Sequence, residues 1–381
     1  MAVVSPISMV KHFESLPDPR HQRNRRHLLV DVIVIAVCGV IAGCEGPTAV
    51  HRWATAKEDW LRQLLKLPHG IPSRDCVRRV LSALKPEAFQ RCFGEWIAES
   101  FSSDDDDATR HIAIDGKTLR RSHDRGAGLG PLHVVSAWAS RQGLALGQLA
   151  TEEKSNEITA IPELIDQIDV SGAVVTIDAM GCQRQIAEKI VAAGGDYVLA
   201  VKENQPKLYA AIHDFFSEHL EDDCRSISCR RDETHEKGHG REDDRYYYLA
   251  KLPDDFPLKA KWPGLKAIGM ACRITEHAGG KTSDEVRYYI SSRYTSGTKF
   301  GAAVRDHWGI ENSLHWVLDV TFDEDQSRTR ERRLADNFAW LRRLAVGLLK
   351  QHPSKHSIKG KRQIAGWNND FLTEVLAITA T

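Results

Sequence analysis

The sequence lacks paired cysteines, a long apolar run and an excess of charge of either sign. Its eight cysteines form no C-x-x-C pair and have no regular spacing, which fits reduced cytosolic thiols. The most apolar stretch, Leu28–Cys44, is interrupted by Asp31. Its uninterrupted part is shorter than the roughly 20 residues of a membrane span. No basic segment precedes an apolar one near Met1, so we expect no secretory signal, no membrane partner and a cytoplasmic location.

The charges balance in total but are unevenly distributed. Lys and Arg together number 52, as do Asp and Glu, so the total indicates no nucleic-acid partner. Between Ser327 and Arg362, however, eleven Lys and Arg residues stand against two acids, whereas residues 104–107 are all aspartates. A neutral total can therefore hide a basic face.

Length and patterning predict more than one domain. At about 100–200 residues per domain, 381 residues suggest two or three. Residues 1–103 have apolar positions at helical spacing and predict a helical domain, in which Ser73 caps a helix that carries Arg74, Arg78 and Arg79. That basic face could contact DNA phosphates or simply face the solvent. The acidic residues 104–110 predict a linker.

The pattern then changes to short β-branched runs. Three consecutive strands, expected at 111–114, 132–140 and 144–150, are followed by alternating helices and strands up to residue 220. This order predicts an α/β domain over 111–350 with a mixed sheet covered by helices on both faces. Residues 221–294 predict an insertion of antiparallel strands. Long helices are expected at 301–318 and 332–350, and residues 351–381 read as a weakly patterned basic tail.

Two aspartates stand at corresponding places on two expected strands. Asp115 follows the strand at 111–114, and Asp178 follows the strand at 173–177. If these strands are neighbours, the carboxylates come together, and each raises the pKa of the other unless a cation neutralises them. Mg²⁺ suits such a site because it prefers hard oxygen ligands. For either aspartate alone, capping of the next turn is the commoner role.

A third carboxylate, Glu311, lies within the helix expected at 301–318. His307, Glu311, His315 and Asp319 recur every four residues and therefore share one helix face. Such a face can be exposed to solvent or bind zinc, although the H-E-x-x-H spacing of a zinc protease is absent. It can equally present one carboxylate to the aspartate pair on the sheet.

These three carboxylates stand in segments that resemble the DDE transposases of bacterial insertion sequences, most closely the H-repeat-associated group. The resemblance runs from about Lys11 to about Lys350. It rests on five stretches taken together: HFESLPDPR at 12–20, AIDGK at 113–117, TIDAMGCQ at 176–183, AVKENQ at 200–205 and HWGIENSLHWVLDV at 307–320. The family implies a ribonuclease-H-like sheet with a β-rich insertion before the Glu-bearing helix and an N-terminal helical domain.

Carried over residue by residue, the resemblance assigns Asp115, Asp178 and Glu311 as catalytic, metal-binding carboxylates. It implies Mg²⁺, for which Mn²⁺ can substitute, and a transposase that cleaves element ends and transfers the 3′-OH into target DNA.

The sequence departs from the family around Glu311. Related insertion-sequence transposases place a Tyr, an Arg and a Lys around the catalytic Glu at fixed spacing. Here positions 304, 307 and 318 are Val, His and Leu, with Arg305 as a partial substitute. The resemblance therefore does not extend to a hairpin intermediate at the element end.

Basic side chains are the candidates for contacts with the DNA backbone. Lys117 and Lys202 follow expected strand ends, where the alternative is an exposed loop lysine. The other candidates are His239, Arg241, Arg305, Arg328, Arg330, Arg332 and Arg333, with Arg342 and Arg343. For the arginine-rich segment the alternative is a solvated helix exterior. Trp308, Trp316 and Trp340 are predicted to be core residues rather than base-stacking groups.

Two other functions stay open from the sequence. A ribonuclease-H-like endonuclease without strand transfer would use the same carboxylates, and a catalytically silent DNA-binding protein would use only the basic side chains. Pairing of two element ends predicts at least a homodimer on DNA. A transposase would also be associated with the nucleoid.

Overall fold

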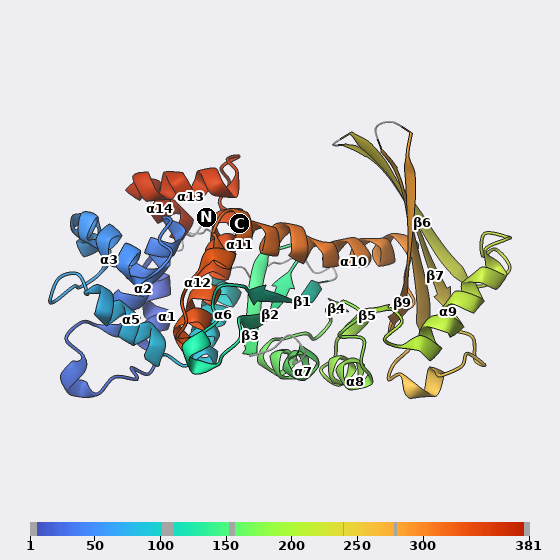
Figure 1. Cartoon of the computed structure of the whole chain (residues 1–381), viewed down its shortest axis with the longest axis horizontal. Helices are drawn as coiled ribbons and strands as arrows, with labels where there is room; N and C mark the ends of the chain where they lie inside the picture. The colour runs from blue at the N-terminus through green and yellow to red at the C-terminus, as the bar shows by residue number, and fades with distance from the viewer. Residues whose placement is uncertain (1–5, 101–109, 152–156, 239, 278–279, 377–381) are drawn as a thin grey trace.

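A nine-stranded sheet organises the computed structural model, which describes residues 6–100, 110–151, 157–238, 240–277 and 280–376 (Figure 1). The strand order is β3-β2-β1-β4-β5-β9-β8-β7-β6. Only the β1–β4 and β4–β5 pairs are parallel; the other pairs are antiparallel. The prediction of a mixed sheet flanked by helices is confirmed. The expected acidic run at 104–107 and His239 lie outside the described residues.

The first five strands follow the predicted order. They are β1 His111–Leu119, β2 Leu132–Ala139, β3 Leu144–Thr151, β4 Val174–Ile177 and β5 Asp196–Val201. One boundary was wrong, because β1 does not end before Asp115. Its antiparallel ladder with β2 continues from Asp115 opposite Ser136 to Leu119 opposite Leu132. Asp115 therefore lies inside a strand that is hydrogen-bonded beyond it.

The antiparallel strands expected at 221–294 are present and extend the same sheet. They are β6 Cys229–Gly238, β7 Arg241–Lys251, β8 Ala267–His277 and β9 Thr282–Ser291. β9 pairs with β5, which joins this segment to the first five strands. The edge strand β6 is almost entirely polar and charged, which discourages pairing with another chain.

Helices cover both faces of the sheet, as predicted (Figure 1). The helices α7 Glu157–Gln167, α8 Arg184–Ala192 and α9 Pro206–His219 pack on one face. α10 Gly297–Ile310 packs on the other face, where Phe300 and Ala303 contact core residues of β4, β5 and β7. α10 thereby crosses the strands that carry the two aspartates.

The N-terminal helices and the C-terminal helices share one core. The N-terminal helices are α1 Pro6–Glu14, α2 Leu29–Ile41, α3 Pro47–Ala56, α4 Glu58–Leu64, α5 Arg74–Ala83 and α6 Pro86–Ser100. Of these, α2, α5 and α6 pack on α12 Arg332–Gln351, whose Trp340 ring lies 6.3 Å from that of Phe93. Ser73 caps α5 as predicted, by accepting a hydrogen bond from the Cys76 amide. No helix among the described residues has the length and apolarity of a membrane span.

The expectation of a weakly patterned basic tail was wrong. The tail forms α13 Ile358–Trp367 and α14 Asn369–Leu376, whose apolar side chains join the core of the N-terminal helices. Two of its cations are structural: Lys361 Nζ donates to the carbonyls of Leu349 at 2.9 Å and His352 at 2.7 Å, and Arg362 donates to that of Thr321. Buried cations here satisfy the carbonyls at helix ends.

Candidate functional site

Asp115 and Asp178 stand side by side on adjacent parallel strands. Ile114 of β1 pairs with Ile177 of β4, and each aspartate is the next residue of its chain. The prediction that these two strands are neighbours is confirmed. Asp178 also caps a turn, since its Oδ1 accepts hydrogen bonds from the amides of Met180 at 3.0 Å and Gly181 at 3.2 Å. The turn fixes the orientation of the Asp178 carboxylate.

Glu311 opens a wide turn that interrupts the helix crossing these strands. α10 passes into a π-helical turn over Glu311–His315 and then into α11 Trp316–Val320. Such turns insert one extra residue per turn and are frequent at functional sites. Here the turn buries the His315 side chain while Glu311 keeps 59% of its side chain exposed.

Three side chains of the regular polar face of this helix contact the sheet, although Glu311 stays largely exposed. His307 Nδ1 is 3.3 Å from Thr176 Oγ1 on β4. His315 Nδ1 is 3.4 Å from Asp115 Oδ2 on β1. Four residues farther along, Asp319 contacts the sheet as well, and the expectation of a shared face is therefore confirmed.

Asp115, Glu311 and His315 form a cluster that could hold a metal ion. Each offers one ligand atom, and the three atoms lie within 4.8 Å of one another. His315 Nδ1 is also 3.8 Å from Glu311 Oε2, so the imidazole lies between the two carboxylates. The sequence placed His315 on the right helix face but gave it no role. Its position one helical turn after Glu311 was the available signal.

The electrostatics of the cluster favour a cation. Burial raises the pKa of Asp115 to about 6; nearby His315 opposes this shift, and the negative charge of Asp178 adds to it. A hydrogen bond from His315 lowers the pKa of Glu311. A desolvated carboxylate beside a second one is costly to ionise without a cation, and carboxylate oxygens are the ligands that Mg²⁺ and Mn²⁺ prefer. The residues therefore fit a divalent ion.

Lys117 is a buried strand residue and not an exposed loop lysine. Its ammonium lies 2.7 Å from Asp319 Oδ1 and 3.0 Å from Asp325 Oδ1. Arg120 contacts the other oxygen of Asp325 at 3.1 Å. In this conformation two carboxylates engage the Lys117 charge, which ties β1 to the end of the Glu-bearing helix.

A buried pair behind Asp115 escaped the sequence reasoning. His133 Nε2 lies 2.6 Å from Glu157 Oε1, and both side chains are almost fully buried. A Cβ atom on Gly116 would collide with both of these atoms. The missing side chain of Gly116 thus admits the pair, and Thr118 Oγ1 holds the other nitrogen of His133 at 2.8 Å. The sequence offered only the glycine of AIDGK as a signal.

The remaining predicted DNA contacts fall into two groups. Lys202, Arg328, Arg330 and Arg333 are exposed. The other three are engaged within the protein: Arg241 Nε lies 3.2 Å from Asp243, Arg305 pairs with Glu236, and Arg332 donates to the Gly130 carbonyl at 2.6 Å. Arg305 therefore contacts β6 rather than the carboxylate cluster.

Two expectations about α12 and the preceding helix were wrong. Arg342 and Arg343 are 2% and 0% exposed, and Arg343 Nη1 lies 3.0 Å from the buried Glu324. They cannot reach DNA because α12 is enclosed by the N-terminal helices and the sheet. Trp308 and Trp316 are 42% and 58% exposed rather than core; Trp340 is buried as predicted.

Comparison with known proteins gives consistent matches along the chain. Residues 106–348 match the model of the transposase DDE domain, and residues 10–97 match that of a domain described as DDE_Tnp_1-associated. The chain is 38% identical over 378 residues to the H repeat-associated putative transposase YhhI of Escherichia coli K12, covering 97% of both chains. It is 38% identical over 374 residues to the putative transposase YncI of Escherichia coli O157:H7, covering 97% and 94%.

A solved structure with some likeness is a cryo-EM structure of the piggyBac transposase synaptic complex with hairpin DNA. The identity is 11%, the TM-score is 0.41, and the match covers 98% of this chain and 82% of that one.

Proposed function

The chain belongs to the transposase DDE-domain family, and from this premise we propose that it cleaves the ends of a DNA element and joins the freed 3′-OH to target DNA. Asp115, Asp178 and Glu311 are the proposed catalytic carboxylates on a ribonuclease-H-like sheet. The observation that carries the proposal is the meeting of three elements. Paired strands bring Asp115 beside Asp178, and the π-helical turn brings Glu311 and His315 to Asp115.

Asp115, Asp178 and Glu311 would hold Mg²⁺, or Mn²⁺ in its place. The bound ions would polarise the scissile phosphate and lower the pKa of the attacking water or 3′-hydroxyl. The protein supplies position: turn amides fix Asp178, and His315 pairs with both other carboxylates. Cleavage and joining can use one site, because only the nucleophile changes between them.

Exposed cations near this site would hold the DNA. Lys202 follows β5, next to the strand that precedes Asp178. Arg328 and Arg330 lie between the Glu-bearing helix and α12, and Arg333 lies in the first turn of α12. Contacts with phosphates fix the register of the duplex without reading its sequence. The proposed substrate places the protein at cytoplasmic DNA, in the nucleoid, and pairing of two element ends would need at least a dimer.

A joining assay tests this function. Purified protein is incubated with Mg²⁺, a target plasmid and labelled DNA that carries the sequences flanking its own gene, beside the Asp178→Asn variant. The matched control is Asp166→Asn, an exposed aspartate of α7 that pairs with Lys189. We expect joined products with the wild type and the control, and none with Asp178→Asn or with EDTA.

The other outcomes separate the alternatives. Cleavage without joining would indicate a ribonuclease-H-like endonuclease. Binding with neither reaction would indicate a DNA-binding protein whose carboxylates do not act, and would contradict the proposal.

A further inference from the structure

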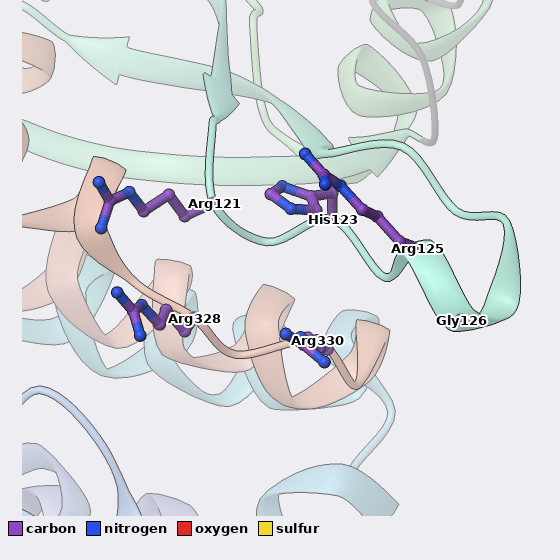
Figure 2. A pocket seen from close by; sticks show the side chains of 6 residues that line it. All are labelled: Arg121, His123, Arg125, Gly126, Arg328 and Arg330. Atoms are coloured by element: carbon purple, nitrogen blue, oxygen red, sulfur yellow. The ribbon is translucent and has the colours of Figure 1, made fainter.

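A basic pocket opens between two segments that are far apart in the sequence. Figure 2 shows Arg121, His123 and Arg125 on the loop between β1 and β2, facing Arg328 and Arg330 on the segment before α12. The cavity measures about 410 Å³, and its sixth lining residue is Gly126. Its lining thus contains four arginines and a histidine, and no carboxylate.

Within the part of the chain that the structure describes, no carboxylate forms an ion pair with the arginines of this pocket. All four arginines are exposed, and none has a carboxylate within 4 Å or a side-chain hydrogen bond among the described residues. The neighbouring cations differ: Arg120 pairs with Asp325 at 3.1 Å, and Arg332 donates to a carbonyl. Guanidinium groups that line one cavity, with no paired carboxylate among the described residues, repel one another, and a bound anion relieves this repulsion.

The loop that forms one wall is fixed by its own hydrogen bonds. Asp124, its single acid, accepts from the amides of Gly126 at 3.1 Å and Ala127 at 3.3 Å. The buried Ser122 hydroxyl donates to the Leu119 carbonyl and accepts from the Leu132 amide, both at 2.7 Å. The acid is therefore occupied by backbone donors, and the arginines project from a defined frame.

The opposite wall is fixed as well and is tied to the loop. Glu331 caps α12 by accepting from the Arg333 and Leu334 amides at 3.2 and 2.7 Å. The buried Arg342 donates to Ser327 Oγ at 3.3 Å. The bond from Arg332 to the Gly130 carbonyl joins the two walls. Such a pre-organised site loses little entropy when an anion binds.

We propose that this pocket extends the DNA contacts of Arg328 and Arg330 to the loop between β1 and β2, as a clamp that holds the sugar–phosphate backbone beside the reacting phosphate. The planar guanidinium binds phosphate oxygens in pairs, and two facing walls can hold a strand between them. From Asp115 to Leu119 the strand β1 spans roughly 13 Å at about 3.3 Å per residue, and the pocket begins two residues later. That length corresponds to about four base pairs of B-DNA.

The clamp rests on the proposed function, so its test measures binding without catalysis. Binding of labelled duplex DNA is followed by fluorescence anisotropy in EDTA at several salt concentrations. The variant is Arg121→Ala/Arg125→Ala. The control, Arg62→Ala/Arg225→Ala, removes two exposed arginines that are paired with Glu58 and Asp223. Because all four side chains are exposed, the thermal unfolding of both variants should match that of the wild type.

We expect the pocket variant to lose affinity at least tenfold near 0.1 M salt. Its plot of log K against log salt should be shallower by about 2, since each phosphate contact contributes about 0.9 to the slope. The control should keep both values. The lysine variant Arg121→Lys/Arg125→Lys should keep the slope but bind more weakly, because it retains charge and loses the paired donors.

A second measurement locates the clamp on the DNA. Single phosphates are neutralised as methylphosphonates along the strand, and we expect one about four base pairs from the cleavage site to weaken binding by the wild type but not by Arg121→Ala/Arg125→Ala.

Three results would overturn the clamp. The first is an equal salt slope for the wild type and the pocket variant. The second is equal sensitivity of both proteins to every neutralised phosphate. The third is displacement of the labelled DNA by polyglutamate at the same concentration at which unlabelled duplex DNA displaces it. In each case wild-type binding to DNA would still support the proposed function. A wild type that binds no DNA would instead contradict that function itself.

Discussion

His315 Nδ1 lies 3.4 Å from Asp115 Oδ2, so an imidazole of the helix stands against a buried carboxylate of the sheet. The same nitrogen is 3.8 Å from Glu311 Oε2. One side chain thereby links two proposed ligands from different elements. The arrangement holds the carboxylates in place but leaves Asp115 costly to ionise, as its raised pKa indicates.

Neutralising Asp115 should therefore separate metal binding from stability. Burial raises the pKa of Asp115 to about 6, above the ordinary value of 3.8, so the folded state disfavours its ionised form at pH 7.5. Without metal, Asp115→Asn should raise the free energy of unfolding by about 1–2 kcal/mol. Millimolar Mn²⁺ should raise the melting temperature of the wild type and leave that of the variant unchanged. Scanning fluorimetry measures both melting temperatures. An equal rise in the wild type and the variant would show that Asp115 is not a metal ligand.

Lys117→Met tests whether this lysine is structural. The change leaves Asp319 and Asp325 without their shared cation, so we expect the free energy of unfolding to fall by about 2–4 kcal/mol. Urea unfolding measures the loss, and the double variant Lys117→Met/Asp319→Asn should recover part of it. A variant with wild-type stability that binds DNA more weakly would instead assign Lys117 to the DNA backbone.

Gly116→Ala should be more damaging than an ordinary change of one methyl group. The added Cβ atom would collide with the buried side chains of His133 and Glu157, which have little room to move. We expect a loss of about 2–3 kcal/mol in unfolding free energy, together with the loss of joining activity. The matched control is Gly94→Ala in α6, where a Cβ meets no atom within 4 Å. That change should stabilise the protein by about 0.5–1 kcal/mol, and equal effects of the two variants would contradict the prediction.

Asp336 should make stability depend on pH. Burial raises its pKa to about 6 in the folded state, against a hydrogen bond from Gln148 that lowers it, whereas the ordinary value is 3.8. The folded state therefore binds the proton more tightly, and stability falls as the pH rises from about 4 to about 6. Asp336→Asn should remove this pH dependence and raise the free energy of unfolding by about 2 kcal/mol at pH 8. Urea unfolding at pH 4 and pH 8 measures it, and parallel pH profiles for the two proteins would refute it.

Local pattern was sufficient for most of the fold. Alternating β-branched strands and helices of 3.6-residue period are local features, and they predicted the first five strands, the helices on both faces and the antiparallel strands after residue 220. Where the predicted element was wrong, contacts with residues far away in the sequence had determined its structure. β1 continues past Asp115 because β2 offers it partners as far as Leu132. The C-terminal tail becomes helical against a core that is supplied mainly by residues before 100.

The candidate site could also be predicted only in part from the sequence. The spacing of His307, Glu311, His315 and Asp319 predicted one helix face, and the two strand aspartates predicted a pair. The burial of arginines could not be foreseen, because Arg328 and Arg343 belong to the same basic segment. One is exposed beside a pocket and the other is enclosed with Glu324.

The sequence by itself determined the family and the order of most elements, and it predicted the three carboxylates, since each of these rests on residues close together in the chain. The tertiary structure alone decided which cations are free. Lys117, Arg305 and Arg343 are paired with Asp319, Glu236 and Glu324. Arg121 and Arg125 line one pocket with Arg328 and Arg330, and none of these four has a paired carboxylate among the residues that the structure describes. Paired and unpaired cations look alike in the local sequence, because only the fold determines which opposite charges lie close enough to pair with them.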